Sequence, residues 1–230
     1  MQSDRKLYLS ILSVISCIAV VYLHANGVFW QFSYARYWKT ANFIEVLCYF
    51  AVPVFFMISG ATLMDYREHY STTVFFKRIS KTVIPFIFWS LIGLVYNFCV
   101  DNQYFVGKSI TDVIAMIANT QVISIYWFFI PLFSVYLSIP ILSLIPSNLR
   151  VGVFKYGAII SFVLYGIIPC FARVLDIPYN NGLQISAVSG YMCYILIGYL
   201  ISHCDIKKRN RIVLYILGVV GFLFHLLGTY

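Results

Sequence analysis

Charged residues are scarce in this chain of 230 residues. Lys, Arg, Asp and Glu supply only 10% of the sequence, whereas an ordinary soluble domain carries about 25%. The 24 charged side chains cannot cover the surface of a water-soluble domain of this size, and 61% of the residues are hydrophobic. The hydrophobic residues come in runs of about 20, which is the length that a helix needs to cross a bilayer. The composition therefore excludes a soluble protein and predicts a polytopic membrane protein.

Several motifs of common catalytic sites are also absent from the sequence. The six cysteines form no C-x-x-C pair and have no metal-ligand spacing, so we predict no metal site. There is no serine-nucleophile motif and no glycine-rich phosphate loop. The net charge of +8 does not indicate a nucleic-acid partner, because the basic residues lie between the hydrophobic runs. The first run lacks an A-x-A cleavage site, so we expect it to stay as a membrane span.

The hydrophobic runs predict an all-α membrane helical bundle of seven spans in a single domain that covers residues 1–230. Twelve of the 16 Lys and Arg residues fall on the side of the N-terminus in this arrangement. Because Lys and Arg favour cytoplasmic loops, we predict a cytoplasmic N-terminus. The longest polar loops are expected at residues 65–81, 101–121 and 173–187. The spans are expected at residues 7–29, 42–64, 82–100, 122–145, 151–172, 188–203 and 211–230.

Two titratable residues at a similar depth are the first candidates for chemistry. His24 lies roughly 27 Å along the first helix from Lys6, toward the external side, and a neutral imidazole there could act as a general base. Glu45 lies a few residues inside the second span and requires a partner, for which His24 is the nearest candidate by depth. Alternatively, His24 anchors the helix end at the interface and Glu45 contacts only water.

Arg78 and Lys81 form the second candidate group. They are three residues apart, so a helix would place them on one face at the cytoplasmic membrane surface. Two cations in this position could hold the phosphates of an anionic cofactor. The alternative is simple anchoring to lipid headgroups, which spacing alone favours.

The chain resembles the bacterial integral-membrane acyltransferase family 3, in particular the branch that O-acetylates envelope polysaccharides and their lipid-linked precursors. The likeness covers nearly the whole chain, with a weaker part from residue 191 to the C-terminus. The stronger parts are IAVVYLH at 18–24, VPVFFMISG at 52–60, KRISKTVIPF at 77–86 and the segment 126–142.

The resemblance implies transfer of an acyl group, usually acetyl, from acyl-CoA on the cytoplasmic side to a sugar hydroxyl. The conserved histidine of the family falls on His24, as acyl-transfer base or transient acyl carrier. The R-x-x-R pair of the family falls on Arg78 and Lys81, which are expected to engage the CoA moiety. The implied partners are acyl-CoA, membrane lipid and a polymeric or lipid-linked sugar in the bacterial inner membrane, and a homo-oligomer is compatible with the sequence.

The chain departs from the family pattern in three ways. The family has an arginine eleven residues before the histidine, where this chain has Ser13. The second basic residue of the pair is Lys81, which keeps the charge of arginine but lacks its planar fork. The family usually carries about ten spans, so we expect that a chain of seven spans lacks the last helices and is a truncated or inactive relative.

Two other classes of function stay open at this point. A transporter of a lipid-linked sugar would use Glu45, Asn97 and His225 along a path, although the sequence shows no internal repeat. A non-catalytic partner of an envelope-assembly enzyme would explain the missing arginine. The loop after the fifth span carries groups suited to sugar hydroxyls, although ordinary solvation of the loop is the favoured explanation. These groups are Arg173, Asp176, Asn180, Asn181 and Gln184.

Overall fold

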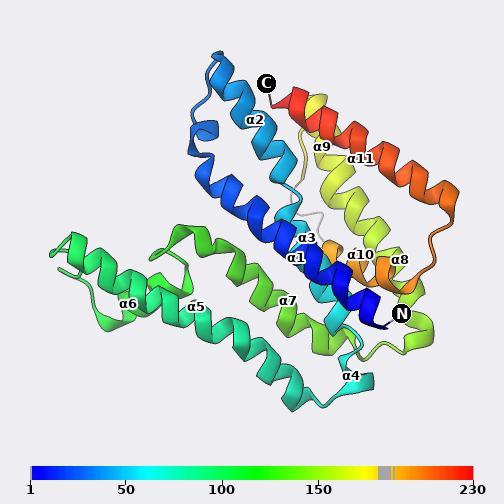
Figure 1. The fold of residues 1–230 in the computed structure, drawn as a ribbon, viewed down its shortest axis with the longest axis horizontal. Coiled ribbons are helices and arrows are strands. Elements are labelled where there is room, and N and C mark those ends of the chain that lie inside the picture. The colour runs from blue at the N-terminus through cyan, green and yellow to red at the C-terminus, as the bar shows by residue number, and fades with distance from the viewer. Residues whose placement is uncertain (1, 181–187, 189, 230) are drawn as a thin grey trace. The chain divides into compact units, whose positions relative to one another are not determined.

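The computed structural model describes residues 2–180, 188 and 190–229, and the regular elements of these residues are helices (Figure 1). Six helical stretches are long and apolar enough to cross a membrane, and Met192–His203 is a shorter apolar helix. Each of these seven overlaps one predicted span, so the predicted all-helical membrane architecture is confirmed. The six are Leu7–Ala25, Arg36–His69, Thr72–Val100, Ser124–Leu142, Ser147–Val174 and Lys208–Gly228.

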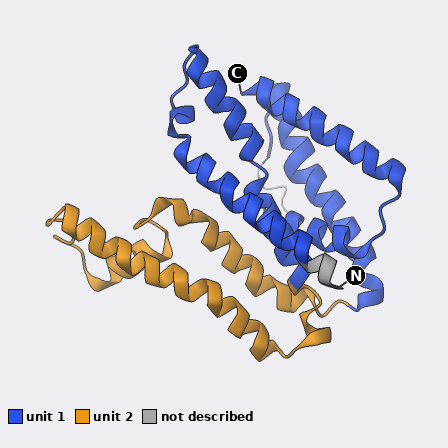
Figure 2. Cartoon of the chain, in the orientation of Figure 1, with its two compact units in different colours: residues 1–62, 146–230 blue, residues 63–145 orange. Residues whose placement is uncertain are grey.

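The chain divides into two compact units, Met1–Thr62 with Pro146–Tyr230 as unit 1 and Leu63–Ile145 as unit 2 (Figure 2). Unit 1 contains α1 (Gln2–Ala25), the 3₁₀ turn η1 (Gly27–Trp30), α2 (Arg36–Cys48), α3 (Ala51–Leu63), α8 (Ser147–Phe162), the π-helix η3 (Val163–Ile167), α9 (Ile168–Val174), α10 (Met192–His203) and α11 (Lys208–Gly228). Unit 2 contains α4 (Tyr66–His69), α5 (Thr72–Val100), α6 (Ile110–Ala118), the 3₁₀ turn η2 (Ser124–Phe128) and α7 (Phe129–Leu142).

Helices α3 and α10 of unit 1 approach each other closely at two glycines. Gly60 of α3 faces the backbone of Ile195 in α10, and Gly198 of α10 faces the backbone of Met57 in α3. A Cβ on Gly60 would lie 2.8 Å from the carbonyl carbon of Ile195, so only glycine allows this contact. Small residues of this kind let membrane helices pack tightly without a hydrophobic driving force. The fully buried Phe56 stacks on Tyr191 beside this contact at 4.6 Å.

Helix α5 begins ten residues earlier than the sequence predicted, at Thr72 instead of residue 82. The hydroxyl of Ser71 caps its N-terminus by accepting a hydrogen bond from the backbone N–H of Val74 at 3.4 Å. The basic residues 77, 78 and 81 therefore lie on the first turns of a helix and not in a loop. The hydropathy signal missed this segment because its charged residues mask the helical start.

The second predicted span is interrupted between α2 and α3, at Tyr49 and Phe50. Pro53 explains the break, because it has no backbone N–H to donate to the carbonyl of Tyr49, four residues earlier. The predicted loop at 101–121 also differs, because α6 occupies residues 110–118. A capping box between Ser109 and Asp112 starts α6, and these hydrogen bonds from Ser109 lower the pKa of Asp112.

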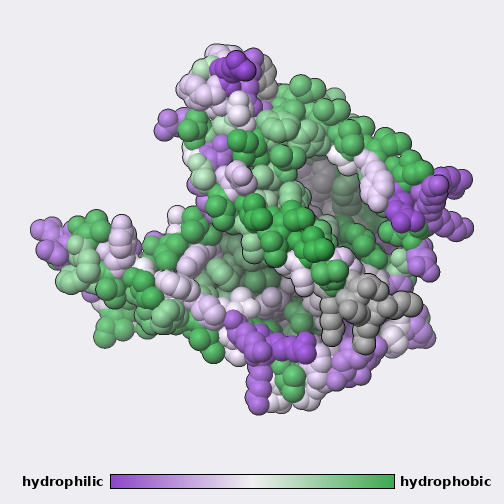
Figure 3. Space-filling model, in the orientation of Figure 1, coloured by the Kyte–Doolittle hydropathy of each residue, from purple (hydrophilic) through white to green (hydrophobic). Residues whose placement is uncertain are grey.

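Hydrophobic side chains cover much of the surface in view, and hydrophilic ones gather near helix ends and loops (Figure 3). Many large apolar residues of the long helices are exposed, for example Val21 at 67%, Ile141 at 69% and Leu227 at 72%. Such a surface is unfavourable in water and matches the hydrocarbon core of a bilayer. The chain is therefore a multi-pass membrane protein.

Candidate functional site

His24 lies in the last turn of α1, and its side chain is exposed. The helix ends one residue later, at Ala25, and the chain then turns through η1 toward α2. The position of His24 therefore depends on how this turn is held.

Asn26 holds the turn, and its amide is the link between α1 and the polar face of α2. The Nδ2 group donates to the Oε2 atom of Glu45 at 2.9 Å and to the backbone oxygen of Ala41 at 2.8 Å. Glu45 is only 4% exposed, so its carboxylate requires such a donor. Sequence reasoning missed Asn26, because an asparagine after a helix end is an ordinary turn residue.

Trp38 strengthens the same turn from an earlier position on α2. Its indole N–H donates to the backbone oxygen of Phe29 at 3.0 Å, and its ring stacks on the ring of Phe29 at 5.9 Å. Trp38 and Glu45 are seven residues apart, so they lie on one face of the helix. The end of α1 is thus bound to α2 at two levels.

The structure places His24 and Glu45 in the same unit but does not join them directly. Within the described residues, no hydrogen bond connects the two side chains, and the carboxylate of Glu45 accepts from Asn26 instead. The connection between the two predicted residues runs through the backbone from His24 to Asn26. Their roles in chemistry stay predictions.

Helix α11 reaches the same face of α2. The amide of Asn42 donates to the backbone oxygen of Leu226 at 3.1 Å, and Asn42 is 3% exposed. The ring of His225 lies edge-on to the ring of Tyr49 at 5.2 Å. These contacts give His225 and Asn42 packing roles at the end of α11.

Asn97, the remaining residue of the transporter hypothesis, lies in unit 2 and donates to the hydroxyl of Tyr104 at 3.2 Å.

Arg78 and Lys81 both lie exposed on α5 in unit 2, three residues apart on one helix as predicted. The guanidinium of Arg78 lies over the ring of Tyr70, 4.3 Å from its centre. Burial raises the pKa of the Tyr70 phenol, and the neighbouring charge of Arg78 acts in the opposite direction. The aromatic contact orients Arg78 while its N–H groups stay accessible to an anion.

Arg67 is a third basic residue of unit 2, and it has a structural role. Its Nε donates to the hydroxyl of Ser143 at 2.8 Å, and its Nη2 donates to the backbone oxygen of Pro140 at 3.2 Å. Both acceptors lie at the C-terminal end of α7, where a cation is favourable. Arg67 therefore fastens α4 to α7.

Ser13 occupies the place where a cation was expected near His24. Its hydroxyl donates to the backbone oxygen of Leu9 at 3.0 Å, within α1 itself. In the part of the chain that the structure describes, no group of three His, Cys, Asp or Glu side chains could hold a metal ion.

Comparison with known protein families matches the acyltransferase domain to residues 6–230. The match therefore includes both units and all four predicted site residues. No curated protein and no solved structure matches the chain.

Proposed function

The chain belongs to the membrane acyltransferase family 3, and from this membership we propose that it transfers an acetyl group from acetyl-CoA to a sugar hydroxyl. Family membership makes it an acyltransferase enzyme, and its helices make it a multi-pass membrane protein. The proposed acceptor is an envelope polysaccharide or its lipid-linked precursor. The proposed location is the bacterial inner membrane, with the N-terminus in the cytoplasm.

In the proposed reaction His24 is the general base. Its imidazole takes the proton of the sugar hydroxyl as the sugar oxygen attacks the thioester carbonyl carbon. The carbon–sulfur bond then breaks, the CoA thiolate leaves, and the proton passes from His24 to that thiolate. Such a base contributes about 10²–10⁴-fold to the rate.

Glu45 acts in this proposal as a positioning residue. The observation that supports it is the buried carboxylate of Glu45, which binds Asn26 two residues beyond His24. A hydrogen bond to a buried carboxylate is stronger than one between neutral groups, so it restrains the turn that follows α1. Restraint of this turn limits the positions that the His24 ring can adopt.

Arg78 and Lys81 are proposed to bind the phosphates of acetyl-CoA. Their exposed side chains lie on the first turns of α5, and Tyr70 holds the guanidinium of Arg78 from one side.

Transfer of labelled acetyl from acetyl-CoA to envelope glycan, in membranes that contain the chain, tests the proposal. We expect His24→Ala to lower transfer by about 10²–10⁴-fold. Asn26→Ala is expected to lower kcat roughly tenfold, the effect of losing one charge-assisted hydrogen bond, with the KM for acetyl-CoA unchanged. Glu45→Gln keeps an acceptor for Asn26 and is expected to retain more activity than Glu45→Ala.

His69→Ala is the matched control, because His69 is another exposed histidine but lies on α4 in unit 2. It is expected to retain wild-type transfer. Absence of transfer by the wild-type chain would overturn the proposed reaction, and full activity of a folded His24→Ala variant would remove His24 from it.

A further inference from the structure

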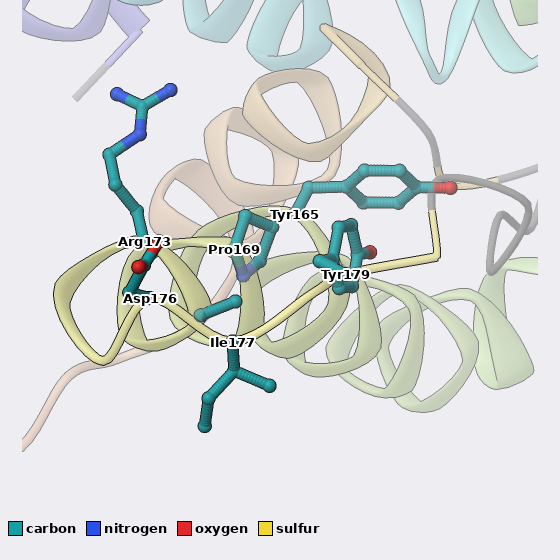
Figure 4. A pocket seen from close by; sticks show the side chains of 7 residues that line it. Tyr165, Pro169, Arg173, Asp176, Ile177 and Tyr179 are labelled. Atoms are coloured by element: carbon teal, nitrogen blue, oxygen red, sulfur yellow. The ribbon is translucent and has the colours of Figure 1, made fainter.

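A cavity of about 480 Å³, open to the surface, lies in unit 1 where α9 passes into the loop that follows it. Its walls include Tyr165, Pro169, Arg173, Asp176 and Tyr179. The two charged side chains lie at one end in Figure 4 and the two tyrosine rings at the other, with Pro169 between them. The volume is within the range of roughly 300–1,000 Å³ that is typical of small-molecule sites. Asn181 and Gln184, which we expected in the same loop, lie outside the described residues.

The backbone around the cavity is irregular for identifiable reasons. Pro169 has no N–H for the carbonyl of Tyr165, and the helix widens to the π-helix η3 at Val163–Ile167. The hydroxyl of Tyr179 donates to the backbone oxygen of Leu164 in this π-helix, at 3.2 Å. The loop is thereby fastened to the helix that it follows, which gives the cavity a defined wall.

Asp176 adds local strain to the same wall. Its φ of 52° lies in the left-handed region, where glycine is the least strained residue. The N–H of Ile177 donates to the backbone oxygen of Ala172 at 2.9 Å, which completes the turn after α9. A carboxylate thus stands at a position where a glycine would suffice, and strained residues of this type concentrate at binding sites.

The side chains define the chemistry of a ligand. Arg173 and Asp176 are exposed, and neither forms an ion pair or a side-chain hydrogen bond with any residue that the structure describes. Together they offer donors and acceptors with no net charge, which suits the hydroxyls of a neutral sugar ring and not an anion. Tyrosine rings supply flat apolar surface for the C–H face of such a ring.

A second cavity of about 340 Å³ adjoins the first and shares Ala172, Ile177 and Tyr179 with it. Its remaining walls are apolar and include Ile168, Phe171 and Leu175. A ligand that fills both cavities therefore has a polar head and an apolar chain.

We propose that these adjoining cavities bind the acceptor as a glycolipid, with a neutral sugar ring between Arg173, Asp176 and the tyrosines and its lipid chain along Phe171 and Leu175. The identification of this ligand as acceptor rests on the proposed function. Binding of a lipid chain in the second cavity favours a lipid-linked sugar over a free polysaccharide as the substrate.

The test uses methyl and octyl glycosides of glucose, galactose, N-acetylglucosamine and rhamnose, titrated into the chain in lipid nanodiscs and observed by saturation-transfer NMR. We expect at least one methyl glycoside to bind saturably. Asp176→Asn is expected to weaken it about ten- to a hundredfold, since hydrogen bonds to charged groups are lost. Asparagine tolerates the left-handed backbone, so the turn is kept. Asp205→Asn, an exposed aspartate outside the cavity, is the control.

The octyl glycoside is expected to bind at least about tenfold more tightly than its methyl counterpart. Phe171→Ala should reduce this advantage. Partition of the octyl glycoside into the lipid is the same for the wild-type protein and the variant, so it cannot cause the difference. Failure of every glycoside to bind, or equal binding by Asp176→Asn, overturns the site.

A transfer assay separates this site from the proposed function. If Asp176→Asn raises the KM for the acceptor and leaves acetyl-CoA binding unchanged, both proposals are supported. If the Asp176→Asn variant transfers acetyl with an unchanged KM for the acceptor, the glycolipid site is overturned and the proposed acetyl transfer is not. Glycoside binding that depends on Asp176, in a wild-type chain without transfer activity, overturns the acetyl transfer alone.

Discussion

At the residue scale, the side-chain amide of Asn26 makes two hydrogen bonds that few other side chains could make together. It supplies two N–H donors in one plane, and both are used, by the carboxylate of Glu45 and the backbone oxygen of Ala41. An apolar side chain at this position would leave a buried carboxylate without a donor, which costs several times more than an ordinary hydrogen bond gains. Asn26 therefore belongs with His24 and Glu45 in any further study.

The basic pair of α5 gives a second prediction at this scale. Changing both Arg78 and Lys81 to Ala is expected to weaken acetyl-CoA binding by about 2–4 kcal/mol, because two charge-assisted hydrogen bonds of about 1.5–3 kcal/mol each are lost and solvent screening lowers both values at exposed side chains. The wild-type affinity should also fall as salt rises, since the side chains are exposed. Isothermal titration calorimetry in nanodiscs measures both effects.

Lys108→Ala is the matched control for this experiment. Lys108 is another exposed lysine of unit 2, but it lies outside α5 and far along the chain from Arg78 and Lys81. Its affinity for acetyl-CoA is expected to stay near the wild-type value. If the double variant and the wild type bind acetyl-CoA with equal affinity, Arg78 and Lys81 do not bind its phosphates, and anchoring to lipid headgroups remains as their role.

At the element scale, the close contact of α3 with α10 depends on their glycines, and α11 packs mainly against α2. None of the apolar window of α11 is buried within the described residues. Asn42 binds the backbone near its C-terminus, and Phe222 lies edge-on to Phe43 at 6.1 Å. From Ile212 onward, most of the remaining surface of α11 is apolar, as is suitable for contact with lipid.

The contact between α3 and α10 gives the prediction for this scale. Gly60→Ala and Gly198→Ala are each expected to lower the free energy of unfolding by roughly 1–3 kcal/mol or more, because backbone atoms must move apart. A Cβ on Gly198 would lie 2.6 Å from the carbonyl carbon of Met57. Thermal unfolding of the chain in detergent measures the loss.

Gly218→Ala in α11 is the control, because nothing lies within 4 Å of a Cβ at that position. It should be neutral or slightly stabilising, since alanine favours helices more than glycine does. A Gly60→Ala variant as stable as Gly218→Ala would contradict the close packing of α3 and α10.

At the scale of the whole molecule, charge determines the expected orientation in the membrane. Twelve of the 16 basic residues lie on the predicted cytoplasmic side. Reporter fusions after Tyr70 and Arg209 are therefore expected to be cytoplasmic, and fusions after Trp38 and Asn180 external. Paired phosphatase and fluorescent-protein reporters measure the side at each position. Four predicted spans lie between Tyr70 and Arg209, so both positions are expected on the same side. An external Arg209 would mean that the chain crosses the membrane an odd number of times between them.

Much of the architecture could be predicted because membrane insertion depends on local composition. A run of about 20 apolar residues marks a span whatever the rest of the chain does, so all seven predicted spans meet an apolar helix. The charges of the loops predict orientation by the same local logic. The spacing of Arg78 and Lys81 placed them correctly on one helix, although the start of α5 was predicted ten residues too late.

The sequence by itself thus determined the helical class, the approximate spans and the candidate residues, since each depends on neighbours along the chain. Only the tertiary structure decided which residues meet. It gave Glu45 the amide of Asn26 as partner, brought Gly60 against Ile195, and formed the cavity between Tyr165, Arg173 and Tyr179. These contacts depend on how helices pack and where turns bend, and hydropathy is nearly the same for every arrangement of apolar helices in lipid.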